Sequence, residues 1–180
     1  MTTVKIDLSP LLIFSNSRQE IYLLDRQKNR QIFSYPAHNN TENPEGNPLI
    51  TGSFSPAPFG FLALSPPDFI TEEYRKSFYE LYLGGSEPVI GESFVQEWGD
   101  FLEEEMGPVR FALGSPCAPV GFSDRAAWDR ELLIHGARSF DTLTKGCIRM
   151  KNEDLVQLAL QWILMFRKGF PLKSLMVIPD

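Results

Sequence analysis

Three short runs of strand-forming residues open the chain and limit the folds open to it. They are Leu11–Phe14, Ile21–Leu24 and Gln31–Tyr35, and short polar segments separate them. Apolar runs of this length, bounded by turn residues, are typical of β-strands. The sequence therefore predicts an antiparallel meander at the start of the domain.

Later elements do not restore a regular alternation of strand and helix. Residues 36–58 are rich in Asn, Pro, Gly and Ser and predict a long loop. Further strands are expected at 59–64, 109–113, 132–134 and 175–178, and helices at 71–84, 91–106 and 152–168. A doubly wound sheet would alternate the two kinds of element throughout. We expect a mainly β core with attached helices (α+β), forming one domain over residues 1–180 with a helical insertion at about 71–106.

The helix boundaries carry specific signals. Thr71 is suited to cap a helix whose buried face would carry Tyr74, Phe78, Leu81 and Tyr82. Asn152 is a good N-cap residue for the last helix, which would end near Lys168 before Gly169. The acidic run at 103–105 is interpreted as a solvated helix end.

Composition excludes several classes of protein. A net charge of −6 over 180 residues argues against a nucleic-acid binder, which needs a basic face. No apolar run approaches the ~20 residues of a membrane span. Two cysteines and two histidines are too few for a convincing structural zinc site, so neither a metal nor a cofactor is expected. The first ten residues make a poor secretory signal, so either export follows another route or the chain lacks its leader.

One stretch places an imidazole and a thiol near each other in the sequence. His135 follows an apolar run and precedes Gly136, and Cys147 follows Gly146 twelve positions later. Strands that end side by side at these glycines would bring the two side chains together, which is the minimum that a cysteine nucleophile requires.

The surroundings of Cys147 suit a reactive thiolate. Lys145, Arg149 and the N-terminus of the following helix would supply positive charge that favours ionisation. Backbone N–H groups at Gly146 could contribute to an oxyanion hole. A structural cysteine and a hydrogen-bonded histidine remain the alternative reading, and His38 and Cys117 are interpreted as structural.

The pattern resembles the YkuD-type L,D-transpeptidase signature. The matching segments are Ile134-His-Gly136 and Thr144-Lys-Gly-Cys-Ile-Arg-Met150, followed by an acidic residue at Asp154 and a leucine-rich helix. The likeness is specific over residues 128 to 160 and looser over 11 to 64. Two features depart from the family pattern: Lys145 replaces its usual histidine, and the segment between His135 and Cys147 is short.

The resemblance implies an antiparallel, β-sandwich-like catalytic fold and assigns roles to named positions. Cys147 would be the nucleophile, His135 the general base, and the carbonyl of Gly136 would orient the imidazole. Gly146 and Cys147 would donate N–H groups to the oxyanion. Arg149 would hold the motif loop or contact a substrate carboxylate, with Thr144 and Lys145 beside it.

The implied function belongs to cell-wall biogenesis and cell shape. The enzyme would attack a peptidoglycan stem peptide after its third residue, release D-alanine and pass the acyl group from Cys147 to an amine. Water as acceptor would make it an L,D-carboxypeptidase, and a non-catalytic peptidoglycan-binding protein is the alternative from another class. The implied location is the cell envelope, and a monomer is expected.

Overall fold

The computed structural model describes residues 8–39, 60–85, 107–114, 132–137 and 147–180. The helix predicted at 91–106, the acidic run at 103–105 and Cys117 lie outside these residues. So do three of the candidate site residues, Thr144, Lys145 and Gly146.

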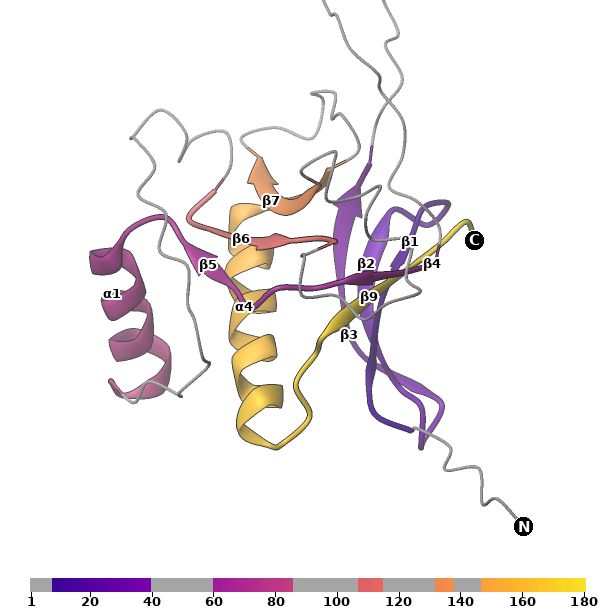
Figure 1. Ribbon diagram of the computed structural model, residues 1–180, viewed down its shortest axis with the longest axis horizontal. Helices are drawn as coiled ribbons and strands as arrows, with labels where there is room; N and C mark the ends of the chain where they lie inside the picture. The colour runs from indigo at the N-terminus through magenta and orange to yellow at the C-terminus, as the bar shows by residue number, and fades with distance from the viewer. Residues whose placement is uncertain (1–7, 40–59, 86–106, 115–131, 138–146) are drawn as a thin grey trace, which may run out of the picture.

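Within the described residues, one sheet of nine strands forms the body of the protein, in the order β4-β9-β1-β2-β3-β8-β7-β6-β5 (Figure 1). The strands are β1 (Leu11–Ser15), β2 (Glu20–Asp25), β3 (Arg30–His38), β4 (Gly60–Ala63), β5 (Asp68–Phe69), β6 (Val109–Ala112), β7 (Leu133–Ala137), β8 (Ile148–Lys151) and β9 (Ser174–Ile178). The two described helices are α1 (Glu72–Leu83) and α4 (Asn152–Arg167).

The predicted meander is confirmed. Strands β1, β2 and β3 pair antiparallel in sequence order, with Ile13 opposite Tyr22 and Tyr22 opposite Ser34. Four consecutive residues of β1, from Leu12 to Ser15, are buried, so both faces of this strand are covered. The first strand therefore lies inside the protein rather than at an edge.

A mainly β fold with attached helices is also confirmed, but the sheet is mixed. Strand β9 pairs parallel with β1, and β8 pairs parallel with β7, whereas the remaining strand pairs are antiparallel. Parallel neighbours need a longer connection than a hairpin. Both parallel pairs meet this requirement, because residues 138–147 lie between β7 and β8 and most of the chain lies between β1 and β9. The expectation of an antiparallel sheet therefore holds for only part of the molecule.

Helix α4 covers the sheet where β6, β7 and β8 lie, as Figure 1 shows. Its buried face carries Leu155, Val156, Leu158, Ala159, Trp162, Ile163 and Met165. The indole N–H of Trp162 donates to the carbonyl of Leu172 at 2.9 Å, which fastens the helix to the segment leading into β9.

The start of α4 differs from the prediction. Lys151 occupies the N-cap position without a side-chain cap hydrogen bond, and Asn152 is the first helical residue. The predicted capping role of Asn152 was therefore wrong. Its side chain instead packs against Gly136, as described below.

Helix α1 has the predicted ends but a different buried face. The Thr71 hydroxyl accepts a hydrogen bond from the N–H of Tyr74 at 3.0 Å, and Gly84 ends the helix with φ +62°. Phe78 and Tyr79 are the buried residues. Leu81, expected inside, is 76% exposed because the helix presents position 79 to Phe69 instead.

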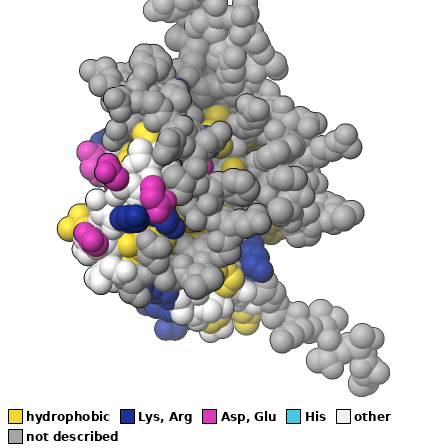
Figure 2. Space-filling model, turned by 60° about the vertical axis from the view of Figure 1, so that its left-hand side comes forward, with side chains coloured by type: hydrophobic (Ala, Val, Ile, Leu, Met, Phe, Trp, Pro, Cys, Tyr) yellow, Lys and Arg dark blue, Asp and Glu magenta, His cyan; other side chains and the backbone are white. Residues whose placement is uncertain are grey.

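The side of the molecule around α1 carries mixed charges. Figure 2 shows acidic and basic side chains interspersed with hydrophobic ones over the described part of this side, with neither sign dominating. The exposed residues of α1 include Glu73, Lys76 and Glu80. This side, as far as the structure describes it, therefore offers no basic face of the kind that binds nucleic acids.

Candidate active site

His135 lies in the middle of β7, between β6 and β8, and not at the end of a strand. The predicted placement at a strand end was wrong because Gly136 and Ala137 continue the strand. The residue is also 2% exposed. A titratable side chain thus occupies an interior position of the sheet.

A row of charged or titratable residues crosses five neighbouring strands at this level. Each residue stands directly opposite the next, in the order Asp68, Arg110, His135, Arg149 and His38. Residues directly opposite one another in a sheet share a face. Their sequence neighbours Ile134, Ile148 and Phe111 point to the other face and belong to the hydrophobic core. The row therefore forms a line of polar side chains on one face of this part of the sheet, with the hydrophobic core on the other.

Two of these residues were not singled out from the sequence. Arg110 lies between the buried Val109 and Phe111, so its charge within a strand pattern was a usable signal. Asp68 follows two prolines in a strand of only two residues and gave no such signal. His38, interpreted as structural, lies opposite Arg149 at the end of β3.

The imidazole of His135 is held by its own backbone neighbour. Its Nδ1 atom lies 2.6 Å from the carbonyl oxygen of Gly136. A carbonyl can only accept, so Nδ1 carries the proton of the neutral ring and Nε2 carries the lone pair. The ring is thereby oriented with Nε2 as a proton acceptor.

Burial keeps this imidazole neutral. Desolvation lowers the pKa of His135 to about 4, and the nearby Arg149, His38 and Arg110 act in the same direction. The hydrogen bond to the Gly136 carbonyl acts against them. At neutral pH the side chain is therefore uncharged and able to accept a proton.

Cys147 immediately precedes β8 and is half-buried, with its sulfur present as a thiol. Side chains alternate between the two faces of a strand. If the alternation of β8 is continued back by one residue, Cys147 lies on the same face as Arg149, which is two positions further along the chain. Because β7 and β8 are parallel and Ile134 faces Ile148, Cys147 falls on the level of Leu133. Strand spacing and rise then put its Cα about 8 Å from that of His135, within reach of the two side chains.

The N-terminus of α4 is not a neighbour of Cys147. The four residues of β8 separate them, a length of about 13 Å. A helix dipole acts mainly within about one turn of the helix end. The expected contribution of this helix to thiolate formation was therefore wrong, and the charged side chains of the row are the closer influence.

Gly136 is required by close packing. A Cβ atom here would lie 2.0 Å from Oδ1 of Asn152 and 2.8 Å from Cα of Gly107. The Oδ1 atom is buried and accepts no hydrogen bond from the residues that the structure describes. Gly136 thus lets the start of α4 and the segment before β6 close against β7, next to His135.

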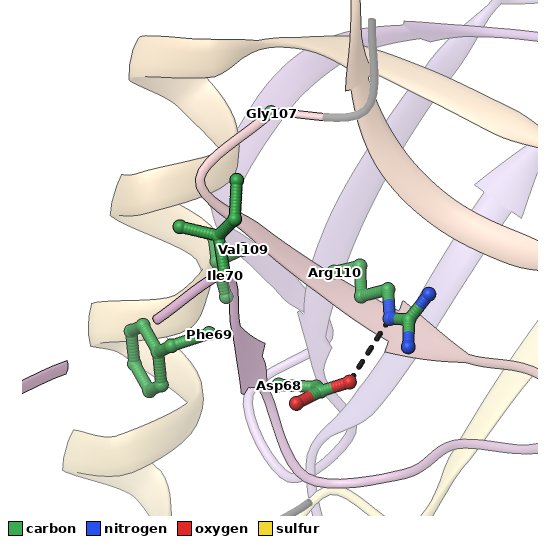
Figure 3. Close-up of a pocket in the computed structure, with 6 residues that line it drawn as sticks. All are labelled: Asp68, Phe69, Ile70, Gly107, Val109 and Arg110. Atoms are coloured by element: carbon green, nitrogen blue, oxygen red, sulfur yellow. Dashed lines mark hydrogen bonds and ion pairs between the residues drawn. The ribbon is translucent and has the colours of Figure 1, made fainter. Parts of the chain in front are cut away.

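Arg110 is fixed from the side away from His135. Its Nε donates to Oδ2 of Asp68 at 2.9 Å, and the side chains of the two residues are only 17% and 13% exposed. Burial is the main cause of a lowered pKa for Arg110. The pair borders a small, partly open pocket, also lined by Phe69, Ile70, Gly107 and Val109 (Figure 3).

Comparisons with known proteins give matches at the level of solved structures. No family model and no curated protein matches the chain. The Bdellovibrio bacteriovorus protein Bd1075 is 13% identical with a TM-score of 0.49, over 94% of this chain and 48% of that protein. The helical cell shape determining protein Pgp2 of Campylobacter jejuni is 14% identical with a TM-score of 0.44, over 96% and 47%. An L,D-transpeptidase of Xylanimonas cellulosilytica is 13% identical with a TM-score of 0.47, over 99% and 64%.

The chain spans about half the length of the first two of these proteins. No helix within the described ranges is long and apolar enough to cross a membrane.

Proposed function

We propose that this chain is a cysteine acyltransferase that acts on peptidoglycan stem peptides as an L,D-transpeptidase. The observation behind the proposal is that β7, which contains His135, pairs parallel with β8, which Cys147 immediately precedes; continued strand alternation then puts the two side chains on one face. The tautomer of His135 supports it, because the Nδ1 contact with Gly136 leaves Nε2 as the acceptor. The motif resemblance given above supplies the substrate class.

Acylation begins when Nε2 of His135 accepts the thiol proton as Sγ of Cys147 attacks the substrate. The attacked atom is the carbonyl carbon of the third, L-centred residue of the stem. The carbonyl π electrons move onto oxygen and form a tetrahedral oxyanion. When it collapses, the C–N bond breaks, the imidazolium returns its proton to the departing D-alanine amine, and a thioester remains.

Deacylation reverses these roles with a second substrate. An amine of another stem attacks the thioester carbonyl and Nε2 takes its proton. The C–S bond then breaks, and Sγ recovers the proton from the imidazolium. Water in place of the amine gives an L,D-carboxypeptidase from the same site.

The positive side chains near His135 disfavour a resting ion pair between a Cys147 thiolate and a His135 imidazolium. They favour transfer of the thiol proton at the moment when the sulfur attacks the substrate. Positive side chains at Arg149 and Arg110 disfavour an imidazolium at His135. The same charges favour negative charge on sulfur and on the oxyanion. His135 therefore acts as a general base on a neutral thiol.

The remaining roles follow the family pattern and belong to the proposal. Backbone N–H groups of Gly146 and Cys147 face the oxyanion, with Thr144 and Lys145 in the same loop. Arg149 holds that loop or binds a substrate carboxylate. Residues 1–180 work as one catalytic domain in the cell envelope, and the reaction requires neither a metal nor a cofactor.

The test is incubation of the protein with a purified disaccharide-tetrapeptide. Intact-mass spectrometry should show an adduct of the disaccharide-tripeptide on Cys147, and chromatography should show released D-alanine. Cys147→Ala should abolish both, whereas the distant Thr71→Ser should change neither. Saturable binding to sacculi that survives Cys147→Ala, without an adduct or D-alanine, would overturn the enzymatic proposal in favour of a binding protein.

A further inference from the structure

An ion pair flanks the candidate base on the side away from Cys147. Asp68 of β5 stands directly opposite Arg110 of β6, and Arg110 stands directly opposite His135 of β7. The side chains of Asp68 and Arg110 meet at 2.9 Å, as the dashed line in Figure 3 shows. The ion pair therefore holds the Arg110 side chain on the strand next to His135, at the position directly opposite it.

Stability alone gives little reason for this pair. Taking two charges out of water costs several kcal/mol per ion, and well-packed apolar residues often serve as well or better. The surrounding positions are apolar: Val109 and Phe111 on β6 and Phe69 on β5 are all buried. A charged pair at this place in the sheet therefore indicates that the charge of Arg110 has a function other than stabilising the fold.

Arg110 and His135 occupy directly opposite positions on adjacent strands. Directly opposite residues of an antiparallel pair have Cα atoms about 4.5–5.5 Å apart. The other described charged or titratable groups that the strand registers put on this face are Asp68 on β5, Arg149 and Lys151 on β8, His38 on β3, and Cys147 just before β8. Arg110 and Arg149 thus occupy the positions opposite His135 on its two neighbouring strands, and Asp68 partly balances the charge of Arg110.

We propose that Asp68 and Arg110 form a positioning pair for His135. Asp68 fixes the side chain of Arg110 on the strand next to His135, and the positive charge held there adds to the effect of burial, so that Nε2 stays available to the thiol. The use of this base in catalysis rests on the proposed function, but the coupling between the pair and His135 does not. Asp68 also limits the uncompensated positive charge that the site holds.

The two partners make opposite predictions. Arg110→Gln removes the positive charge and should raise the titration midpoint of His135 by a few tenths of a unit to about one unit. Asp68→Asn leaves the guanidinium without its counter-charge and should lower the midpoint. Arg110→Lys keeps the charge and should leave the midpoint close to that of the parent protein. A purely structural pair would give loss of stability in each variant without opposite displacements.

The experiment is a titration of the histidine ring protons by NMR. The resonances are assigned by their loss in His135→Asn, and His38→Gln serves as background so that one histidine remains. Circular dichroism establishes that each variant is folded, and Asp68→Asn, which is nearly isosteric, carries the test if Arg110→Gln is not. Opposite displacements support the proposal. A midpoint that is unchanged, or that moves in the same direction in both charge-removing variants, overturns it.

Failure here is distinguishable from failure of the proposed function. If the His135 midpoint moves in opposite directions in the two variants but no thioester adduct forms, the proposed role of the Asp68–Arg110 pair is supported and the proposed enzymatic activity is rejected. If an adduct forms on Cys147 but the His135 midpoint does not move, the enzymatic activity is supported and the proposed role of the pair is rejected.

Discussion

Nδ1 of His135 lies 2.6 Å from the carbonyl oxygen of Gly136, the next residue along β7. The ring is therefore held by the strand that carries it. In many catalytic triads a third side chain orients the base. For His135, the candidate base, a backbone carbonyl orients the ring, and its position depends on how closely Gly136 packs against Asn152 and Gly107.

The buried imidazole predicts a loss of stability in mild acid. Its pKa falls from 6.5 in the unfolded chain to about 4 in the folded protein. The unfolded state therefore binds more protons between these values, and folding stability declines as the pH falls from about 6.5 to about 4. The full effect is about 3 kcal/mol. Urea unfolding at a series of pH values measures it.

The matched control for this pH dependence is His135→Asn. The variant is expected to be less stable at neutral pH but to lose most of the decline between pH 6.5 and 4. An equal decline in the variant and the parent would assign the effect to other groups.

Removal of the base should slow acylation without removing the thiol. His135→Gln is expected to reduce kcat/KM for acylation by about 100-fold or more, the usual contribution of a general base. Cys147 should still react with a small alkylating agent in the unfolded variant, which shows that the thiol is intact. Acylation at the parent rate would exclude His135 as the base.

Gly136→Ala should destabilise the fold through steric overlap. The new methyl would lie 2.0 Å from Oδ1 of Asn152 and 2.8 Å from Cα of Gly107, so side chain and backbone must both shift. The expected cost is about 1–3 kcal/mol in the free energy of unfolding. Chemical denaturation measures it.

A double variant separates the two overlaps. Asn152→Ala added to Gly136→Ala removes the side-chain clash but leaves the backbone of Gly107. Partial recovery is the expected outcome. Complete recovery, or none, would contradict the packing described for this position.

Helix α1 offers a prediction independent of the site. Thr71→Ala removes the acceptor for the N–H of Tyr74 and should lower the free energy of unfolding by about 1 kcal/mol. Thr71→Ser retains the hydroxyl and should cost far less. Equal losses in the two variants would show that the cap hydrogen bond contributes little.

Local signals explain which parts of the fold could be predicted from the sequence. The meander, the Thr71 cap and the extent of α4 depend on residues a few positions apart, and the structure has all three. The predicted capping role of Asn152 was wrong, because its side chain packs against Gly136, a contact between parts of the chain that are distant in sequence.

Only part of the candidate site could be predicted from the sequence. The His-Gly and Gly-Cys motifs pointed to His135 and Cys147 because each motif is local. The row that places His135 between Arg110 and Arg149, with His38 beyond, depends on the strand order β3-β8-β7-β6, which no short sequence pattern encodes. The parallel pairing of β7 and β8 likewise could not be inferred from the apolar runs alone.

Strand β9 lies between β1 and β4, parallel to the first and antiparallel to the second. Strand β1, which is synthesised early, therefore cannot form this half of its backbone hydrogen bonds until β9, the last strand in sequence, has been synthesised. Contacts between such distant segments carry a large loop-closure cost and slow folding. We expect β1 to have an open edge throughout synthesis, so chaperone binding or premature aggregation would act on the nascent chain at this strand.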